Sequence, residues 1–247
     1  MSRRGVLQLS AVGAGALALS PKLDDLREAS TLRPRASAHA SSPKSGGTLT
    51  FGRNTGPTQL DPANSIVEGD VYTLDKIFEP LYITSPAGDL TPWLAESHSV
   101  SADGKTWTFK LRPGVEFSDG KALTADDVVF SINRARKDAN GPLSFLDSAI
   151  KTITATNAST VTFELTQVWA PFLSDISVFA NAILPNNFGG KSEAAFFAKP
   201  VGTGPFLLES FVKGGNVTLK KNPKYWQKGK PYLDEVNFTY VSSDNQR

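Results

Sequence analysis

The sequence predicts an α/β fold built on a mixed β-sheet. Short segments in which apolar and polar residues alternate indicate strands, and two segments with apolar residues three to four positions apart indicate helices. The two kinds of segment are interspersed without regular β-α-β units, which favours a sheet that mixes parallel and antiparallel strands. The 247 residues leave room for one large domain or two small ones.

The clearest predicted strand follows a turn at Asp103 and Gly104, a pair typical of β-hairpins. Trp107, Phe109 and Leu111 then alternate with polar residues, so we expect 107–111 to be a strand with these side chains on its buried side. Other apolar segments bounded by turn residues predict further strands. They lie at 48–51, 81–83, 115–117, 153–155, 161–165, 206–208, 217–219 and 236–241.

The first helix is expected at 71–78, where the apolar residues share one face, and Pro80 should stop it. A second should begin within two residues of Thr124, with Asp127 in a capping-box position. The inward face of this second helix holds Val128, Ile132 and Ala135.

Two further segments are expected to be helical. Residues 92–95 should begin a short helical or irregular segment, and 170–179 should form a helix that starts at Pro171.

Composition excludes several classes of function. The chain has no cysteine, which excludes disulfides, thiol nucleophiles, cysteine metal sites and a lipid-anchored cysteine. The net charge is +2, but residues 1–45 hold seven Lys/Arg and three Asp/Glu, which leaves 19 and 21 in residues 46–247, a net −2. A body so close to neutral does not favour nucleic-acid binding.

The first 40 residues predict an export signal and a flexible leader. Arg3 and Arg4 precede an Ala-, Gly- and Leu-rich stretch too short to span a bilayer, a pattern that resembles a twin-arginine signal. Cleavage is possible after Ala18 or near Ala38 and Ala40, and we expect the mature chain to begin near Ser41.

Catalytic and metal-binding interpretations have little support in the sequence. His98 is the only histidine after the leader, and a lone histidine without fitting carboxylate partners does not make a zinc site. Ser97 and His98 are adjacent, so their side chains should face opposite sides of a strand, and no nucleophile elbow is present. The acids at 126–127 suit a helix N-terminus, and 202–204 lacks the phosphate-loop spacing. We therefore expect no enzyme activity, no metal site and no cofactor.

Several motifs in a fixed order resemble one protein family. The segment 103–120, DGKTWTFKLRPGVEFSDG, follows the family's central motif, and 123–131 continues it. The other matching segments are Ile77-Phe78-Glu79-Pro80-Leu81, Leu94-Ala95-Glu96-Ser97, Gly202-Thr203-Gly204-Pro205-Phe206 and Lys221-Asn222-Pro223-Lys224-Tyr225-Trp226. Over about residues 46–245 the chain resembles the peptide/nickel-binding family of ABC-importer solute-binding proteins. One difference is His98, where the family often has a large aromatic residue, which we interpret as a local packing change.

The resemblance implies a periplasmic-binding-protein-like (type II) fold. Residues 41–247 would form the first lobe, with 63–189 as an inserted subdomain. Family members are about twice as long, so a second lobe is expected to be absent from this chain, which would be a fragment or a truncated product.

The resemblance also implies a function: an extracytoplasmic receptor that binds a peptide or other small solute and delivers it to ABC permease subunits. Such a protein would be periplasmic and monomeric at full length. Ligand contacts are expected in the loop after the first strand and in two other loops. These residues are Arg53, Asn54, Thr55, Trp169, Gly202, Thr203 and Gly204. The alternatives are a non-binding remnant, a partner-interaction domain or a hydrolase on an unrelated fold.

Overall fold

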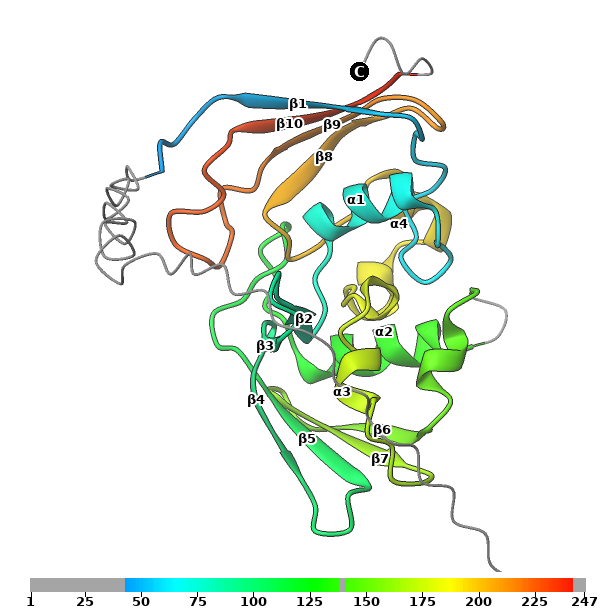
Figure 1. The fold of residues 1–247 in the computed structure, drawn as a ribbon. Helices are drawn as coiled ribbons and strands as arrows, with labels where there is room; N and C mark the ends of the chain where they lie inside the picture. Colours follow the sequence, from blue (N-terminus) through cyan, green and yellow to red (C-terminus); the bar gives the residue numbers. More distant parts are fainter. Residues whose placement is uncertain (1–42, 138–140, 242–247) are drawn as a thin grey trace, which may run out of the picture. The chain divides into compact units, whose positions relative to one another are not determined.

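The computed structural model describes residues 43–137 and 141–241, and its first sheet joins the two ends of that region (Figure 1). β1 (Thr48–Arg53) pairs in parallel with β10 (Glu235–Tyr240), so that Thr48 lies opposite Glu235. β10 pairs antiparallel with β9 (Val217–Lys221), and β9 with β8 (Phe206–Phe211). The order β1-β10-β9-β8 therefore confirms a mixed sheet.

The second four-stranded sheet is antiparallel throughout. Its order is β4-β5-β7-β6, and the strands are β4 (Ala95–Val100), β5 (Thr106–Leu111), β7 (Thr160–Leu165) and β6 (Ile150–Asn157). The turn between β4 and β5 contains Asp103 and Gly104, which confirms the predicted hairpin. A small ladder of β2 (Tyr82–Thr84) and β3 (Leu90–Pro92) completes the strands of the described residues.

The helices lie between the two larger sheets (Figure 1). α1 (Glu68–Ile77) contacts β8 of the first sheet, and α2 (Ala125–Ala135) contacts β6 of the second. The first of the shorter elements lies just before β6, and the others follow β7 along the chain. These are η3 (Ser144–Asp147), α3 (Phe172–Asp175), η4 (Phe179–Asn181), η5 (Asn186–Gly190) and α4 (Glu193–Ala198).

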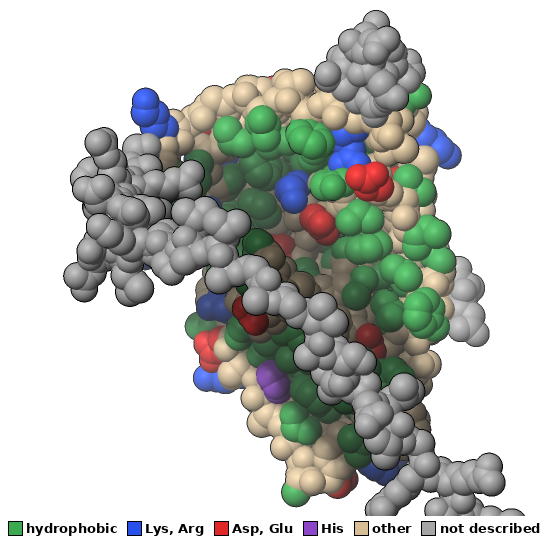
Figure 2. Space-filling model, in the orientation of Figure 1, with side chains coloured by type: hydrophobic (Ala, Val, Ile, Leu, Met, Phe, Trp, Pro, Cys, Tyr) green, Lys and Arg blue, Asp and Glu red, His purple; other side chains and the backbone are tan. Residues whose placement is uncertain are grey.

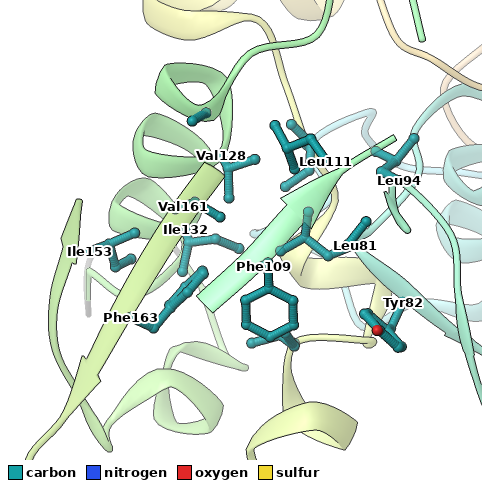
Figure 3. Close-up of a cluster of buried hydrophobic side chains, with 14 of the residues drawn as sticks. Leu81, Tyr82, Leu94, Phe109, Leu111, Val128, Ile132, Ile153, Val161 and Phe163 are labelled. Carbon is teal, nitrogen blue, oxygen red and sulfur yellow. The ribbon is translucent and has the colours of Figure 1, made fainter. Parts of the chain in front are cut away.

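Each sheet has its own apolar core. Against the second sheet, Phe109 packs among residues of β5, β7 and α2, as Figure 3 shows for Val128, Ile132 and Phe163. Phe109 and Leu111 are buried as predicted, while Trp107 is half-buried and packs against the same cluster. Under the first sheet, a separate cluster combines apolar residues of α1 and α4 with those of β8, β9 and β10.

The N-terminus of α2 confirms the predicted capping arrangement. The backbone N–H and the hydroxyl of Thr124 both donate to Asp127 Oδ2, each at 2.7 Å. Because this satisfies a group that the first helical turn would leave open, the helix begins at the next residue.

A buried ion pair connects α2 to the loop after β1. The guanidinium of Arg134 donates to both carboxylate oxygens of Asp61, with the Nη1–Oδ1 distance at 2.9 Å. Its Nη2 also reaches Glu193 Oε1 of α4 at 2.6 Å, and the rings of Phe188 and Phe197 lie beside it. Three chain segments are thus held by one charged group.

Three expectations about secondary structure are wrong. The segment expected at 92–95 is not helical: Pro92 ends β3 and Ala95 begins β4, so that only 93 and 94 are irregular. The helix expected at 170–179 is only the four residues of α3, because the chain turns after it toward η4. The strand expected at 115–117 is a single bridge between Glu116 and Ala122.

Two expectations about organisation stay predictions. The export signal in residues 1–40 lies outside the described residues. The inserted subdomain over 63–189 also remains a prediction. α1 lies inside that range, but it packs in the core of the first sheet.

Candidate functional site

The carboxylate of Glu79 is the centre of a buried polar cluster. Glu79 is 3% exposed, and it follows α1. Trp93 Nε1 and Tyr225 Oη donate to Oε1, both at 2.7 Å. Thr203 Oγ1 at 2.8 Å and Trp226 Nε1 at 3.0 Å donate to Oε2. All four partners are donors, so the arrangement matches an ionised carboxylate, which only accepts hydrogen bonds.

Burial and hydrogen bonding act in opposite directions on Glu79. Burial raises the pKa of its carboxyl, and the four donated hydrogen bonds lower it. Burial of the phenol raises the pKa of Tyr225, and the charge of Glu79 and the hydrogen bond to it raise this pKa further. The cluster therefore holds a charge in a site with little water by surrounding it with donors.

Motifs that the sequence analysis recognised separately meet at this carboxylate. Glu79 belongs to the segment 77–81, Thr203 to 202–206, and Tyr225 and Trp226 to 221–226. Trp93, beside the segment 94–97, completes the cluster and packs edge-on against Trp226 at 5.3 Å between ring centroids. The motifs thus come together as one structural joint.

The loop 202–204 fits tightly against the end of α1. A Cβ on Gly202 would lie 2.0 Å from the carbonyl oxygen of Ile77, so only glycine allows this approach. Gly204 N donates to the same oxygen at 2.9 Å. All three residues of the loop are buried, and Thr203 is 0% exposed. Their contacts are structural, and a ligand contact at these residues stays a prediction.

A surface cavity of about 470 Å³ lies beside the Glu79 cluster. It is bordered by the end of α1, by β2 and by the segment around Phe179. The residues that line it are Asp75, Lys76, Phe78, Glu79, Pro80, Ile83, Thr84, Trp93, Ser177, Phe179, Pro205 and Tyr225. This cavity contains none of the residues predicted to contact ligand.

The second polar cluster lies at the end of β1 and contains Arg53, the first predicted ligand contact. Arg53 is 6% exposed. Its Nη2 lies 3.2 Å from Glu68 Oε1, and its guanidinium carbon lies 3.7 Å from the centre of the Tyr72 ring. Within the described residues, Nε and Nη1 of Arg53 and Oγ1 of Thr55 are buried without a hydrogen-bond partner. This is the part of the described chain where unused donors are concentrated.

The loop after Thr55 is held in place by the fully buried Asp70 of α1. Its carboxylate accepts hydrogen bonds from the backbone of Thr58 and Gln59 and, at 2.6 Å, from Ser65 Oγ. On the other side, Gly214 N donates to Pro57 O at 2.7 Å. The loop that carries Asn54 and Thr55 is therefore held by Asp70 on one side and by Gly214 on the other.

Trp169 lies in a different region from Arg53. It follows β7 of the second sheet and is 36% exposed, and its Nε1 donates to Asp175 Oδ2 at 2.7 Å. Arg53, Asn54 and Thr55 thus lie together because they are adjacent in the sequence. Thr203 is joined to Glu79. Trp169 lies outside both the Arg53 cluster and the Glu79 cluster.

The sequence patterns did not predict the roles of Glu68, Tyr72, Asp70 and Glu79. A signal existed for three of them, because Glu68 and Asp70 are acids in the first turn of a helix and Glu79 is an acid within an apolar segment. Nothing in the sequence indicates that Tyr72 covers Arg53.

His98 packs with aromatic side chains. Its ring stacks on Trp107 with 5.3 Å between centroids, and Nδ1 lies 2.8 Å from Tyr82 Oη. Burial lowers the pKa of His98. These contacts confirm the interpretation as a packing position.

Residues 43–137 and 141–241 contain neither a candidate metal site nor a candidate membrane span. No group of three or more His, Cys, Asp or Glu residues there could hold a metal ion. No helix in the same ranges has the length and apolar character needed to span a bilayer.

Hydrophobic side chains cover much of the face shown in Figure 2. Beneath the first sheet they lie next to Lys, Arg, Asp and Glu side chains (Figure 2). On β1, Leu49 and Phe51 are exposed although they lie opposite the buried Val236 and Phe238 of β10. These two β1 side chains, at the edge of the sheet, therefore lie outside the buried apolar core of the first sheet.

Comparison with known proteins identifies the fold. The oligopeptide-binding protein AppA from Bacillus subtilis, solved with a nonapeptide, superimposes with a TM-score of 0.74 at 27% identity, over 83% of this chain and 42% of that one. AgaA from A. tumefaciens R10, solved with agropinic acid, gives 0.77 at 32% identity, over 81% and 41%. The predicted type II periplasmic-binding-protein fold is confirmed for the part they share.

Sequence relatives agree with the structural ones. The probable D,D-dipeptide-binding periplasmic protein DdpA of Escherichia coli K12 is 31% identical over 220 residues, which cover 85% of this chain and 42% of that protein. The chain thus spans less than half the length of the relatives it matches. A family model described as "Bacterial extracellular solute-binding proteins, family 5 Middle" matches residues 89–247. The chain therefore belongs to the bacterial extracellular solute-binding proteins of family 5.

Proposed function

We propose that the chain is part of an extracytoplasmic receptor that binds peptides or similar small solutes for an ABC importer. The observation that carries the proposal is its superposition on 42% of the AppA chain, which was solved with a bound nonapeptide. The name of DdpA, a probable D,D-dipeptide-binding protein, supports the same class of ligand.

Binding without catalysis is the reading that the side chains support. His98, which a Ser-His-Asp hydrolase would use as its base, is engaged with Tyr82 and Trp107. Asp127, one of the two acids at 126–127, caps α2 and also accepts from Asn186 N at 2.7 Å. Both groups have packing or capping partners in place of a nucleophile.

The receptor's location and partners follow from the same proposal. DdpA is named a periplasmic protein, which supports a periplasmic location for this chain. Export by the twin-arginine route and transfer of solute to membrane permease subunits belong to the proposal. The proposal also includes a monomeric full-length state and the absence of nucleic-acid binding.

The chain covers only part of the length of its relatives, and this lowers the affinity for solute that we expect of it. Solute-binding clefts bury most of a ligand's surface between facing walls. The chain aligns with 42% of the AppA chain, so it supplies only part of such a cleft. Fewer contacts then have to offset the same loss of ligand freedom.

Titration calorimetry of the chain with a mixed pool of short peptides tests the proposal. We expect saturable binding with a dissociation constant of about a millimolar or weaker, which corresponds to about 4 kcal/mol or less. Micromolar binding by a monomer would show that this region is already a complete receptor, against the proposal of a partial cleft. Absence of any binding heat at saturating peptide would count against the receptor itself.

A further inference from the structure

The guanidinium of Arg53 has more hydrogen-bond donors than the described residues satisfy. Nη2 is paired with Glu68 Oε1 at 3.2 Å, while Nε and Nη1 are buried and have no acceptor there. Two residues further on, Thr55 Oγ1 is also buried and unpartnered. Buried polar atoms almost always have partners in folded proteins, so three such atoms in three residues indicate a group that is yet to bind.

Two side chains that contact Arg53 are exposed and can move away. Glu68 is 64% exposed in its side chain, and Tyr72, whose ring lies 3.7 Å from the guanidinium carbon, is 41% exposed. Because exposed side chains change rotamer easily, rotation of these two residues would open Arg53 without a change in the backbone.

The resident ion pair is weaker than the pair that Arg53 can form. Glu68 contacts Arg53 through a single oxygen at 3.2 Å, and because the Glu68 side chain is 64% exposed, water screens its charge and the pair adds little stability. A guanidinium presents two parallel N–H groups that match both oxygens of a carboxylate. A free carboxylate can therefore make two charge-assisted hydrogen bonds where Glu68 makes one.

The other acid in the first turn of α1, Asp70, is already engaged. Asp70 uses its carboxylate to accept hydrogen bonds from Thr58, Gln59 and Ser65. The same bonds fix the loop that carries Thr55. The position of the subsite is therefore set before a ligand arrives.

We propose that Arg53 and Thr55 form a subsite for a carboxylate group of the solute, which Glu68 occupies in the free chain and leaves on binding. This rests on the proposed function and adds a chemical class to it: solutes with a free carboxylate. The carboxylate can belong to a peptide C-terminus or to a small organic acid, and the probes below separate these sources.

The direct test uses acetate and the ¹⁵N–¹H signal of Arg53 Nε in the 247-residue chain. Acetate should shift this signal saturably, and Glu68→Gln should tighten acetate binding by about two- to five-fold, because it removes a competing exposed charge. Glu209→Gln removes another ion-paired acid, on β8, whose side chain is 51% exposed, and should match the wild type. Sodium chloride at equal ionic strength controls for screening. An Arg53 signal that acetate does not move in Glu68→Gln would overturn the subsite.

Dialanine and dialanine amide extend the test to peptides. Wild type should bind dialanine more tightly than the amide, and Arg53→Lys should remove most of that preference because an ammonium cannot make the paired contact. If acetate shifts Arg53 while the amide binds as well as dialanine, the subsite serves small organic acids. Equal binding of both peptides together with an unmoved Arg53 signal would refute the subsite and leave the receptor proposal standing.

Discussion

Thr203 donates a 2.8 Å hydrogen bond to the carboxylate of Glu79, which lies 124 positions earlier in the chain. The contact fixes the loop before β8 to the end of α1. Because Tyr225 and Trp226 donate to the same carboxylate from 146 and 147 positions away, one acid holds distant segments in a single arrangement. The clusters around Arg53 and Glu79 therefore have different roles: the first has unused donors, and the second has none.

Replacing Glu79 with glutamine should destabilise the chain. The amide has one acceptor oxygen and a donor NH2 group, so donors that now meet Oε1 or Oε2 would face another donor. Leaving buried donors unpaired costs about 1–3 kcal/mol each, so we expect a loss of about 3 kcal/mol in the free energy of unfolding. Urea unfolding measures it, and Glu116→Gln, at an exposed acid, is the control. Equal unfolding midpoints for the two variants would show that Glu79 is not a structural centre.

Replacing Arg134 with methionine should also be strongly destabilising. The change leaves Asp61, itself 6% exposed, as a buried charge without its partner. Removing one member of a buried pair costs about 3–5 kcal/mol, whereas an exposed pair contributes at most about 1 kcal/mol. Lys220→Met, which breaks the exposed pair with Glu209, is the matched control. A similar loss in both variants would contradict the assigned burial of the Asp61 pair.

The pH dependence of stability should report on Asp147. Burial and the nearby charge of Asp175 raise the pKa of this carboxyl to about 7, although the hydrogen bond from Asn181 Nδ2 at 3.0 Å opposes the rise. A folded-state pKa above the unfolded value means that the folded chain binds a proton that the unfolded chain has lost. The contribution of Asp147 is therefore full below about pH 4 and is lost as the pH rises to about 7.

Asp147→Asn should remove that slope. Unfolding measured by urea from pH 4.5 to 7.5 should show wild type losing stability relative to the variant, by an amount on the order of a few kcal/mol across the range. Asp126→Asn, at an exposed acid of α2, should keep the wild-type slope. Parallel curves for wild type and Asp147→Asn would mean that the carboxyl is ionised in the folded chain throughout.

Sequence patterns predicted the strands that have strong local signals. The hairpin of β4 and β5 and the start of α2 depend on a turn pair, on alternation and on a cap, all within a few residues. The helix expected at 170–179 was wrong because local propensity does not show that the chain turns at Ile176 and enters η4. Neither of these short elements has a strong periodic pattern.

The site was less predictable because its contacts link distant positions. The motif around Glu79 was recognised, but its role depends on donors from three other segments, and a linear sequence does not show which of them meet. Arg53 was predicted as a ligand contact by resemblance alone. Its unused donors and its cover by Glu68 and Tyr72 appear only once β1 and α1 are placed in space.

The most direct test of the receptor assignment maps where a peptide contacts the chain. Trialanine would be added to ¹⁵N-labelled chain up to several times a dissociation constant of about 1 mM, while backbone amides and indole signals are followed. We predict saturable shifts at Arg53, Asn54 and Thr55 and at the Trp169 indole, with the Trp93 and Trp226 indoles unmoved because Glu79 holds them. Saturation that leaves residues 53–55 and Trp169 unmoved would contradict the assignment.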